Sequence, residues 1–357
     1  MTTEIDVDDI AEPAPPPRKP FITRRGLLGA GAALAFGGGG LGAGYALTRT
    51  DETRTADGLR KLKLAWNAAA VCLSPVVLAK DLGIFKKHGL EIDLVNYSGS
   101  SDQLLESIST GKADAGVGMI LRWIKPLEQG FDVKLIAGTH GGCIRVAGSR
   151  KAGISEDPKS LRGKRLGLSE ISGTSRNAFS VLLKKQGIDP DKEITWRAFP
   201  QPLLGEAIRK GEVDAIADSD PILYIMEKES KGDLVEVLTN LTPPWDKRVC
   251  CVVGVSGSLV RSERHTAKAL SDALVSAAAI CNEDPALAAK SFQPYAKASI
   301  EDLVAVLKKQ THDNHPIGQN LRSDIALYAD ELRDVGVMRK TTLPNEFANR
   351  IVEDLYT

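Results

Sequence analysis

The stretch Gly111–Met119, GKADAGVGM, returns one hundred positions later as Gly211–Ser219, GEVDAIADS. The two copies align without a gap over Leu104–Met119 and Leu204–Ser219. Each copy has the pattern of a short amphipathic helix, a glycine that ends it, and a buried strand of small residues. Because both halves of the chain contain this unit, the sequence predicts two similar α/β lobes.

The similarity continues outward from the two copies. Upstream of them, LGIFKKHGL (82–90) resembles VLLKKQGI (181–188), so each half repeats the order strand, helix, strand, helix, strand. From Ser262 onward only helical apolar spacing remains, which predicts helices that cover the first lobe. The chain is expected to cross between the lobes near Ile144–Gly148 and Lys247–Val253, and two crossings form a hinge.

The predicted domain organisation follows from these crossings. It consists of an export signal (1–47), a linker (48–60), the first part of lobe I (61–146), lobe II (147–247), and a return to lobe I with the C-terminal helices (248–357).

The overall composition excludes several classes of protein. A length of 357 residues with 43% hydrophobic residues is sufficient for two cores. Lys plus Arg equals Asp plus Glu at 46 each, and this zero formal charge gives no support to a nucleic-acid partner. Five cysteines are an odd, scattered set, which does not suit a disulfide scaffold. Apart from a GxGxxG match at Gly37–Gly42, inside the glycine-rich stretch of the N-terminal segment, the sequence lacks GxGxxG, Walker, CxxC and HExxH motifs, so no cofactor is expected.

The N-terminal segment has the features of an export signal. Thr23-Arg24-Arg25 precedes Leu27-Leu28 and an uncharged, glycine-rich stretch over Gly29–Leu47, a pattern similar to twin-arginine signals. Cleavage is expected after Ala46, which predicts a periplasmic protein. The alternative is an uncleaved membrane anchor, because the uncharged stretch is long enough to span a bilayer.

The candidate ligand site lies where the two lobes would face each other. In open parallel sheets, ligands bind beyond the carboxyl ends of the strands, where helix N-termini point. Backbone N–H groups at Ser98–Asp102 and Ser172–Arg176 would receive an anionic group. Helix capping is the simpler explanation of either loop alone, but two such loops at equivalent points of a repeat favour a site. Arg176 could bind a sulfonate or carboxylate with two hydrogen bonds. Asp218 and Asp220 would accept hydrogen bonds from an amine or hydroxyl, or cap the helix that begins at Pro221.

These considerations give one set of candidate ligand-binding residues on the loops around the cleft. The set comprises Asn67, Cys72, Ser98, Ser100, Ser101, Met119, His140, Cys143, Glu170, Ser172, Thr174, Ser175, Arg176, Asp218 and Asp220.

His140, Cys143 and Cys72 form the best enzyme-like constellation that the sequence offers. A histidine beside a thiol could create a thiolate nucleophile or a metal site. No carboxylate partner lies at a useful spacing, and cysteine is commonly a small buried hydrophobe, so packing or ligand contact is the favoured interpretation. Cys250 and Cys251 are adjacent on a predicted strand, which would direct their side chains to opposite faces. No catalytic or metal-binding residue is therefore assigned.

Three motifs resemble one known family. SPVVLAKDLGIFKKHGLEI (74–92), GKADA (111–115) and DSDP (218–221) are similar to the nitrate/sulfonate/taurine-binding family of periplasmic solute-binding proteins of ABC importers. The resemblance implies a type II binding-protein fold, a small anionic or zwitterionic solute, delivery to a membrane permease with its ATPase, and no enzymatic activity. Ser219 stands where this family often has an aromatic residue, and Cys72 is not a general family feature.

Three alternatives to import of an anion stay open. The same superfamily includes proteins that bind thiamine pyrimidine precursors and a self-consuming thiamine-pyrimidine synthase, whose dense cysteine motif Cys250-Cys251 does not reproduce. A sensor that docks on a membrane receptor is the second alternative. A cleft enzyme that uses Cys143 with His140, or a metal near Cys72, is the third.

Overall fold

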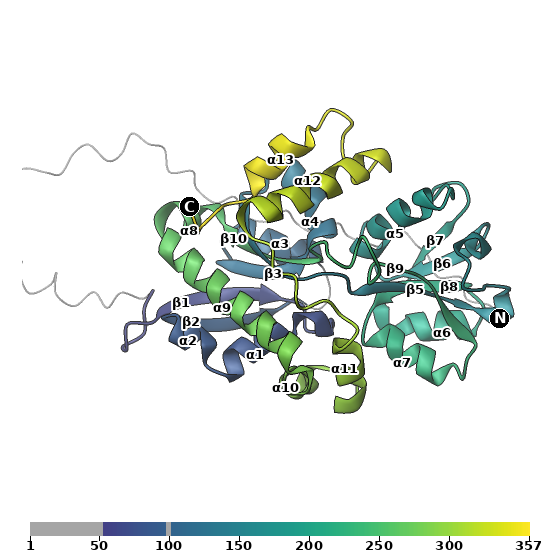
Figure 1. Ribbon diagram of the computed structural model, residues 1–357, viewed down its shortest axis with the longest axis horizontal. Coiled ribbons are helices and arrows are strands. Elements are labelled where there is room, and N and C mark those ends of the chain that lie inside the picture. The colour runs from purple at the N-terminus through teal and green to yellow at the C-terminus, as the bar shows by residue number, and fades with distance from the viewer. Residues whose placement is uncertain (1–52, 98–100) are drawn as a thin grey trace, which may run out of the picture. The chain divides into compact units, whose positions relative to one another are not determined.

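The computed structural model describes residues 53–97 and 101–357, and Figure 1 shows that they form two α/β lobes. Each lobe is built on a five-stranded mixed sheet with helices on its faces, which confirms the predicted fold class. The predicted export signal lies outside the described residues and stays a prediction. Within the described part of the chain, no helix combines the length and the apolar character needed to cross a bilayer.

The two sheets have the same topology, with equivalent strands in equivalent places. Lobe I has the order β2-β1-β3-β10-β4, and lobe II has the order β7-β6-β8-β5-β9. In each sheet the fourth strand is antiparallel to its neighbours and arrives from the other half of the chain. The strands of lobe I are β1 (Arg60–Trp66), β2 (Leu90–Asn96), β3 (Ala115–Met119), β4 (Val133–His140) and β10 (Cys251–Ser256). The strands of lobe II are β5 (Ile144–Ser149), β6 (Arg165–Leu168), β7 (Thr195–Ala198), β8 (Ala215–Ser219) and β9 (Leu234–Thr239).

The sequence repeat corresponds to the central strands β3 and β8. Gly111 and Gly211 have φ angles of 75° and 69°, a left-handed conformation that glycine adopts without a steric penalty. The aspartate before each strand accepts a 2.8 Å hydrogen bond from the backbone of the neighbouring strand: Asp114 from Lys63, and Asp214 from Arg165. The repeated glycine and aspartate therefore set the turn and the register at equivalent points of both lobes.

Helices cover both faces of each sheet. Lobe I carries η1 (Val71–Leu73), α1 (Ser74–Asp81), α2 (Ile84–Lys87), α3 (Ser101–Ser109) and α4 (Ile120–Glu128). Lobe II carries η2 (Arg150–Ala152), η3 (Pro158–Leu161), α5 (Thr174–Lys185), η4 (Gln201–Leu203), α6 (Leu204–Arg209) and α7 (Ile222–Glu229).

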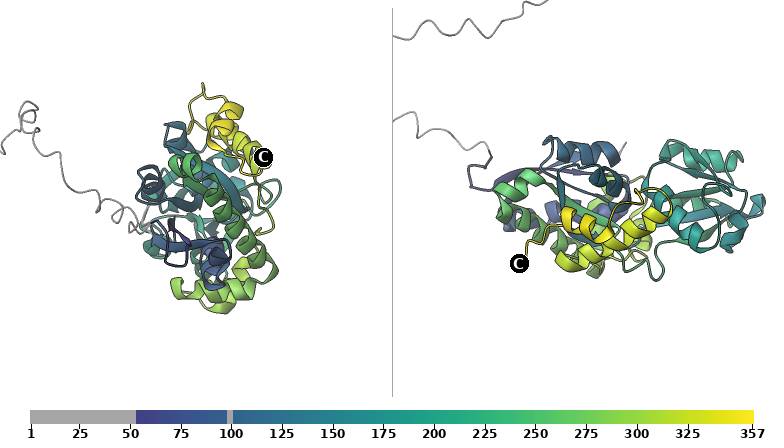
Figure 2. Two further views of the ribbon diagram at one scale, coloured as in Figure 1. Left: turned by 90° about the vertical axis from the view of Figure 1, so that its left-hand side faces the viewer. Right: turned by 90° about the horizontal axis from the view of Figure 1, so that it is seen from above.

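The C-terminal helices pack mainly on lobe I, as Figures 1 and 2 show. They are α8 (Gly257–Ser262), α9 (Arg264–Glu283), α10 (Pro285–Phe292), η5 (Gln293–Tyr295), α11 (Ile300–Leu307), α12 (Gly318–Asp334) and α13 (Pro344–Ile351). The longest of them, α9, buries Ala267, Leu270, Leu274 and Ala277 along one face and packs on α1 and β4. Its alanines allow close packing, so α9 fixes the outer layer of lobe I.

The chain passes between the lobes at two adjacent segments. The first passage runs through Gly141–Cys143, a few residues ahead of the predicted site at Ile144–Gly148, because Ile144 already begins β5 in the sheet of lobe II. The second passage lies between β9 and β10. A side chain on Gly142 would collide with the backbone of Asn240 in the second passage, so the close contact requires glycine. The side-chain oxygen of Asn240 accepts 2.8 Å hydrogen bonds from the backbone N–H groups of Cys143 and Ile144, which ties the two passages together.

Candidate ligand-binding cleft

A cavity of about 470 Å³ lies between the two lobes. It is formed where strands end: Asn67 follows β1, Met119 ends β3, and Asp218 lies near the end of β8. These are the carboxyl ends of strands that run parallel, where open α/β sheets bind ligands. The lining residues are Asn67, Ala69, Ala70, Met119, Ile144, Ser169, Glu170, Gly173, Thr174, Ser175, Pro200, Gln201, Pro202, Asp218 and Ser219.

Asp218 is the buried ionisable residue of this cavity, with 4% of its surface exposed. Its Oδ1 atom accepts hydrogen bonds from the backbone N–H of Ser219 at 2.7 Å and from the side-chain amide of Gln201 at 3.2 Å. Its Oδ2 atom is buried and has no hydrogen-bond partner. Burial is the main cause that raises the pKa of Asp218 from 3.8 to about 6. The cavity therefore contains a carboxylate that is half satisfied and can accept a further hydrogen bond.

The raised pKa predicts how replacement of Asp218 by Asn changes the pH dependence of stability. The folded protein holds the carboxyl proton more tightly than the unfolded chain, so ionisation of Asp218 favours unfolding. This penalty is absent below about pH 4, grows between about pH 4 and 6, and is complete above about pH 6. Asp218→Asn lacks it. The free energy of unfolding of the variant, relative to the parent, should rise by up to about 3 kcal/mol from pH 4 to pH 7.5.

Denaturant titrations of both ligand-free proteins at pH 4, 5, 6 and 7.5 measure this difference. The difference at pH 4 serves as the baseline, because it contains the change in hydrogen bonding but not the ionisation. A difference that does not change with pH would show that Asp218 titrates normally.

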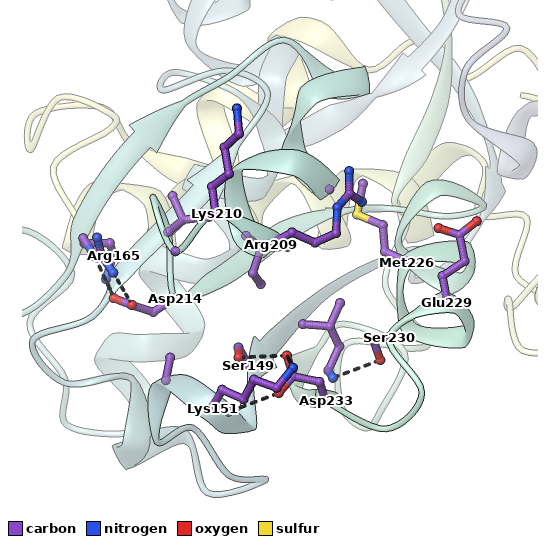
Figure 3. A pocket seen from close by; sticks show the side chains of 16 residues that line it. Ser149, Lys151, Arg165, Arg209, Lys210, Asp214, Met226, Glu229, Ser230 and Asp233 are labelled. Carbon is purple, nitrogen blue, oxygen red and sulfur yellow. Dashed lines mark hydrogen bonds and ion pairs between the residues drawn. The ribbon is translucent and has the colours of Figure 1, made fainter.

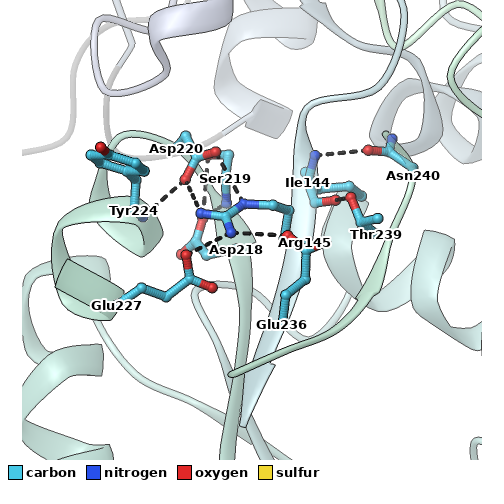
Figure 4. Close-up of polar contacts among 10 residues, drawn as sticks. All are labelled: Ile144, Arg145, Asp218, Ser219, Asp220, Tyr224, Glu227, Glu236, Thr239 and Asn240. Atoms are coloured by element: carbon cyan, nitrogen blue, oxygen red, sulfur yellow. Dashed lines mark hydrogen bonds and ion pairs between the residues drawn. The ribbon is translucent and has the colours of Figure 1, made fainter. Parts of the chain in front are cut away.

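Asp220 does not line the cavity but belongs to a buried ion-pair network, shown in Figure 4. Arg145 of β5 contacts its carboxylate with two hydrogen bonds of 2.7 and 3.1 Å, and also contacts Glu227 at 2.7 Å and Glu236 at 3.0 Å. Asp220 further accepts the backbone N–H of Tyr224 at 2.9 Å in the first turn of α7. Both carboxylate oxygens of Asp220 therefore already accept hydrogen bonds, and this residue has a structural role behind the cavity.

A second buried arginine connects the two lobes. Arg122 of α4 donates to the backbone oxygen of Ser172 in lobe II and to Asp102 of lobe I, and its Nε lies 3.7 Å from Glu170. Beside it, the side-chain amide of Asn177 donates to the backbone oxygen of Leu121 at 2.9 Å. These contacts hold the N-terminal end of α5 against lobe I.

The structure brings together only part of the set predicted from the sequence. Asn67, Met119, Glu170, Thr174, Ser175 and Asp218 line the cavity. Ser98 and Ser100 lie outside the described residues, as does the side chain of Ser101. Arg176 lies elsewhere, with its guanidinium 4.5 Å from the ring centre of Trp196 and paired with Asp191. No lysine or arginine is among the described residues that line the cavity.

Cys72, His140 and Cys143 lie beneath the cavity rather than on its surface. All three are fully buried, while their neighbours Ala70 and Ile144 line the cavity. Direct contact of these side chains with a cavity ligand stays a prediction.

The residue set predicted from the sequence omits Arg122 and Gln201, although the loop Pro200–Pro202 is expected at the cleft. The signal for Arg122 was a lone charge inside the apolar run Ile120–Ile124, which predicts a buried ion pair. Nothing in the sequence singles out the side chain of Gln201 within its loop, because a glutamine between two prolines fits a surface turn equally well.

A larger hollow of about 800 Å³ lies elsewhere on lobe II, and Figure 3 shows its lining. Arg165 begins β6, Asp214 directly precedes β8, and the two side chains pair with each other in this hollow. Asp233 accepts a hydrogen bond from Ser149 there. The hollow thus lies at the amino ends of the parallel strands, and four of its charged groups already pair with one another: Arg165 with Asp214, and Lys151 with Asp233. We therefore place the candidate site in the smaller cavity between the lobes.

Comparison with solved structures supports the fold. The alkanesulfonate-binding protein SsuA of Xanthomonas axonopodis pv. citri superposes with a TM-score of 0.67 at 17% identity, over 82% of this chain and 98% of SsuA. The periplasmic nitrate-binding protein NrtA of Synechocystis PCC 6803 superposes with a TM-score of 0.67 at 14% identity, over 83% of this chain and 86% of NrtA. At these identities the likeness establishes the periplasmic binding-protein fold alone.

Sequence comparison corrects one expectation. The 4-amino-5-hydroxymethyl-2-methylpyrimidine phosphate synthase THI13 of Saccharomyces cerevisiae is 29% identical over 145 residues, which are 40% of this chain and 40% of the yeast protein. The chain thus spans less than half the length of this relative. The expectation that this chain has no enzymatic activity is contradicted, because several curated relatives carry the name of this synthase.

The family assignment rests on a longer match than these pairwise similarities. The family model described as NMT1-like matches residues 55–294, well over half of the chain, and this range contains all ten strands of the described residues. The chain belongs to the NMT1-like family.

Proposed function

We propose that this protein is the extracytoplasmic solute-binding component of an ABC-type importer, and that it takes up a small polar solute bearing an amine. The solute would bind in the cavity between the lobes and pass from there to a membrane permease. Solved proteins of this fold with the names alkanesulfonate-binding and nitrate-binding protein support the general role.

The unpartnered carboxylate oxygen of Asp218 carries the choice of solute. A buried acceptor without a partner costs about 1–3 kcal/mol, and an amine N–H would satisfy it. A simple anion would instead meet the negative charge of Asp218 without a lining lysine or arginine in the described part of the cavity. The predicted class of anionic or zwitterionic solutes is thereby narrowed to solutes with an amino group.

The N-terminus of α5 supports a second polar group on the solute. Gly173 is the N-cap of this helix and its side of the cavity includes Thr174 and Ser175. Because its N-cap residue is a glycine, which has no side chain to cap the helix, the first backbone N–H groups of α5 can receive a sulfonate, phosphate or hydroxyl oxygen. A zwitterion such as taurine, or an aminopyrimidine with a hydroxymethyl or phosphate group, has both features.

The sequence relatives favour a second candidate function, synthesis of an aminopyrimidine phosphate. It is supported by similarity to the yeast pyrimidine phosphate synthase over 145 residues. The purified protein is incubated with a small-molecule extract of cells, and mass spectrometry then measures newly formed 4-amino-5-hydroxymethyl-2-methylpyrimidine phosphate and the mass of the intact chain. Newly formed pyrimidine phosphate or a changed chain mass supports synthesis, and the absence of both supports binding for transport.

A thermal-stability screen with matched ligand pairs tests the proposed solute class. Taurine is compared with ethanesulfonate, which lacks the amine, and 4-amino-5-hydroxymethyl-2-methylpyrimidine with nitrate. A ligand at 100 times its Kd should stabilise the folded protein by about 2.7 kcal/mol. We expect stabilisation by an amino compound and none by ethanesulfonate or nitrate. Equal stabilisation by ethanesulfonate and taurine, or stabilisation by nitrate alone, would contradict the assignment.

A further inference from the structure

Four cysteines and a histidine that are far apart in the sequence meet beneath the cavity. We call them the thiol–imidazole cluster: Cys72, His140, Cys143, Cys250 and Cys251. The potential ligand atoms form two triplets that share His140, one with Cys72 and Cys251 and one with Cys143 and Cys250. Within each triplet these atoms all lie within 4.8 Å of one another. All five residues are buried.

Cys250 and Cys251 join the same cluster, contrary to the expectation from their adjacency. Cys250 precedes β10, whose pairing with β4 shifts register between Cys251 and Val252. The regular alternation of a strand therefore does not govern the two side chains. The Sγ atom of Cys250 lies 3.2 Å from that of Cys143, while the Sγ of Cys251 belongs to the triplet with Cys72.

His140 is oriented as metal-binding histidines are. Its Nδ1 lies 2.7 Å from the backbone oxygen of Gly141, which can only accept, so Nδ1 carries the proton. In the neutral imidazole, the form that binds a metal, the lone pair is then on Nε2, a buried atom without a hydrogen-bond partner. A hydrogen bond from the second ring nitrogen to a backbone carbonyl is the usual way in which a metal-ligating histidine is held.

Packing alone does not account for this arrangement. A single buried cysteine behaves as a small hydrophobe, and Cys281 is an example, with its Sγ 3.5 Å from the hydroxyl of Ser74. The thiol–imidazole cluster differs because it gathers four thiols and an imidazole ring in one buried place, and Nε2 of that ring has no hydrogen-bond partner. His312 adds a second imidazole, whose ring centre lies 5.2 Å from that of His140 and whose Nδ1 is likewise unpartnered.

We propose that the thiol–imidazole cluster binds one thiophilic transition-metal ion through Nε2 of His140 and cysteine thiolates. Thiolate and imidazole together suit Zn²⁺ and Cu⁺ far better than Mg²⁺ or Ca²⁺. Sulfur atoms around a tetrahedral zinc, at about 2.3 Å each, lie about 3.8 Å apart, so the spacing of up to 4.8 Å needs shifts of about 1 Å. Two thiolates balance the charge of Zn²⁺, which makes a neutral site suited to burial.

The position of the ion connects it with the hinge and the cavity. Cys143 lies in the first passage between the lobes, and Cys250 is the last residue before β10 at the end of the second. Cys251 is opposite Met119, which lines the cavity, in the pairing of β10 with β3. An ion here would join both passages to η1 and the end of β4, directly under the cavity floor.

Metal loading of the purified full chain tests the proposal. The protein is stripped with a chelator under reducing conditions, loaded separately with Zn²⁺, Cu⁺ and Co²⁺, and freed of excess ion before metal content is measured. We expect one ion per chain and, for Co²⁺, the intense charge-transfer absorption of thiolate ligands. Whether Zn²⁺ or Cu⁺ is retained against competing chelators identifies the preferred ion.

His140→Ala is the test variant and Cys281→Ser the matched control for a buried side chain outside the cluster. We expect His140→Ala to weaken metal affinity by more than about 100-fold and Cys281→Ser to leave it unchanged. If His140→Ala does not fold, the cobalt spectrum and stoichiometry of the parent protein still decide the question. Retention of less than about one tenth of an ion per chain, a cobalt spectrum without thiolate absorption, or equal loss in both variants would overturn the proposal.

Discussion

Replacement of Arg145 by alanine is expected to lower the free energy of unfolding by about 3–5 kcal/mol. The guanidinium is 2% exposed and pairs with Asp220, Glu227 and Glu236. Burial opposes its charge, but Asp220 and Glu227 outweigh burial and raise the pKa of Arg145 above its ordinary value. Without the arginine, Asp220 would remain as a buried carboxylate without a cation, which is the costly outcome for a broken buried pair.

Urea titrations at pH 7.5 measure this loss, with Arg150→Ala as the matched control. Arg150 pairs with Glu156 on the surface, where the two side chains are 50% and 63% exposed, so its removal should cost at most about 1 kcal/mol. The account would be wrong if the two variants lost equal stability, because burial of the network is what distinguishes them.

Replacement of Asp218 by alanine should remove most of the affinity for an amino-bearing solute. A hydrogen bond from an amine to a buried carboxylate is a charge-assisted interaction, and loss of one partner of such a pair costs about 2–5 kcal/mol. This corresponds to a Kd raised at least about 30-fold. The fold should tolerate the change, because Asp218 leaves one oxygen unpartnered and the alanine removes a buried charge.

Isothermal titration calorimetry with taurine or the aminopyrimidine measures this effect. Asp191→Ala is the matched control, because the carboxylate of Asp191 is 68% exposed and pairs with Arg176 outside the cavity. Its Kd should stay within about twofold of the parent value. An Asp218→Ala protein with parental affinity would place the solute elsewhere.

Much of the fold could be predicted from the sequence because it is repeated locally. Gly111 with Asp114, and Gly211 with Asp214, set equivalent turns and registers over a few residues, so their pattern is visible in the chain. Strand β10 is equally visible, because VCCVVGV (249–255) is a continuous apolar run, as expected of a strand buried on both faces.

The site was harder to predict because its key contacts join distant segments. Asp218 and Asp220 look equivalent in the sequence. Only the structure shows that Arg145, 75 positions before Asp220, donates hydrogen bonds to the carboxylate of Asp220. Arg176 lies in the first turn of α5, near the cavity, yet its side chain stacks on Trp196. The thiol–imidazole cluster was hidden for the same reason: Cys143 and Cys250 are 107 positions apart.

The crystal structure of the complex with an amino-bearing solute tests the central claim most directly. The distance to be measured joins Oδ2 of Asp218 to the nearest nitrogen of the solute. The account predicts a hydrogen bond of about 2.7–3.2 Å. A solute in the cavity whose nitrogen makes no contact with Asp218, or a solute bound outside the cavity, would contradict it.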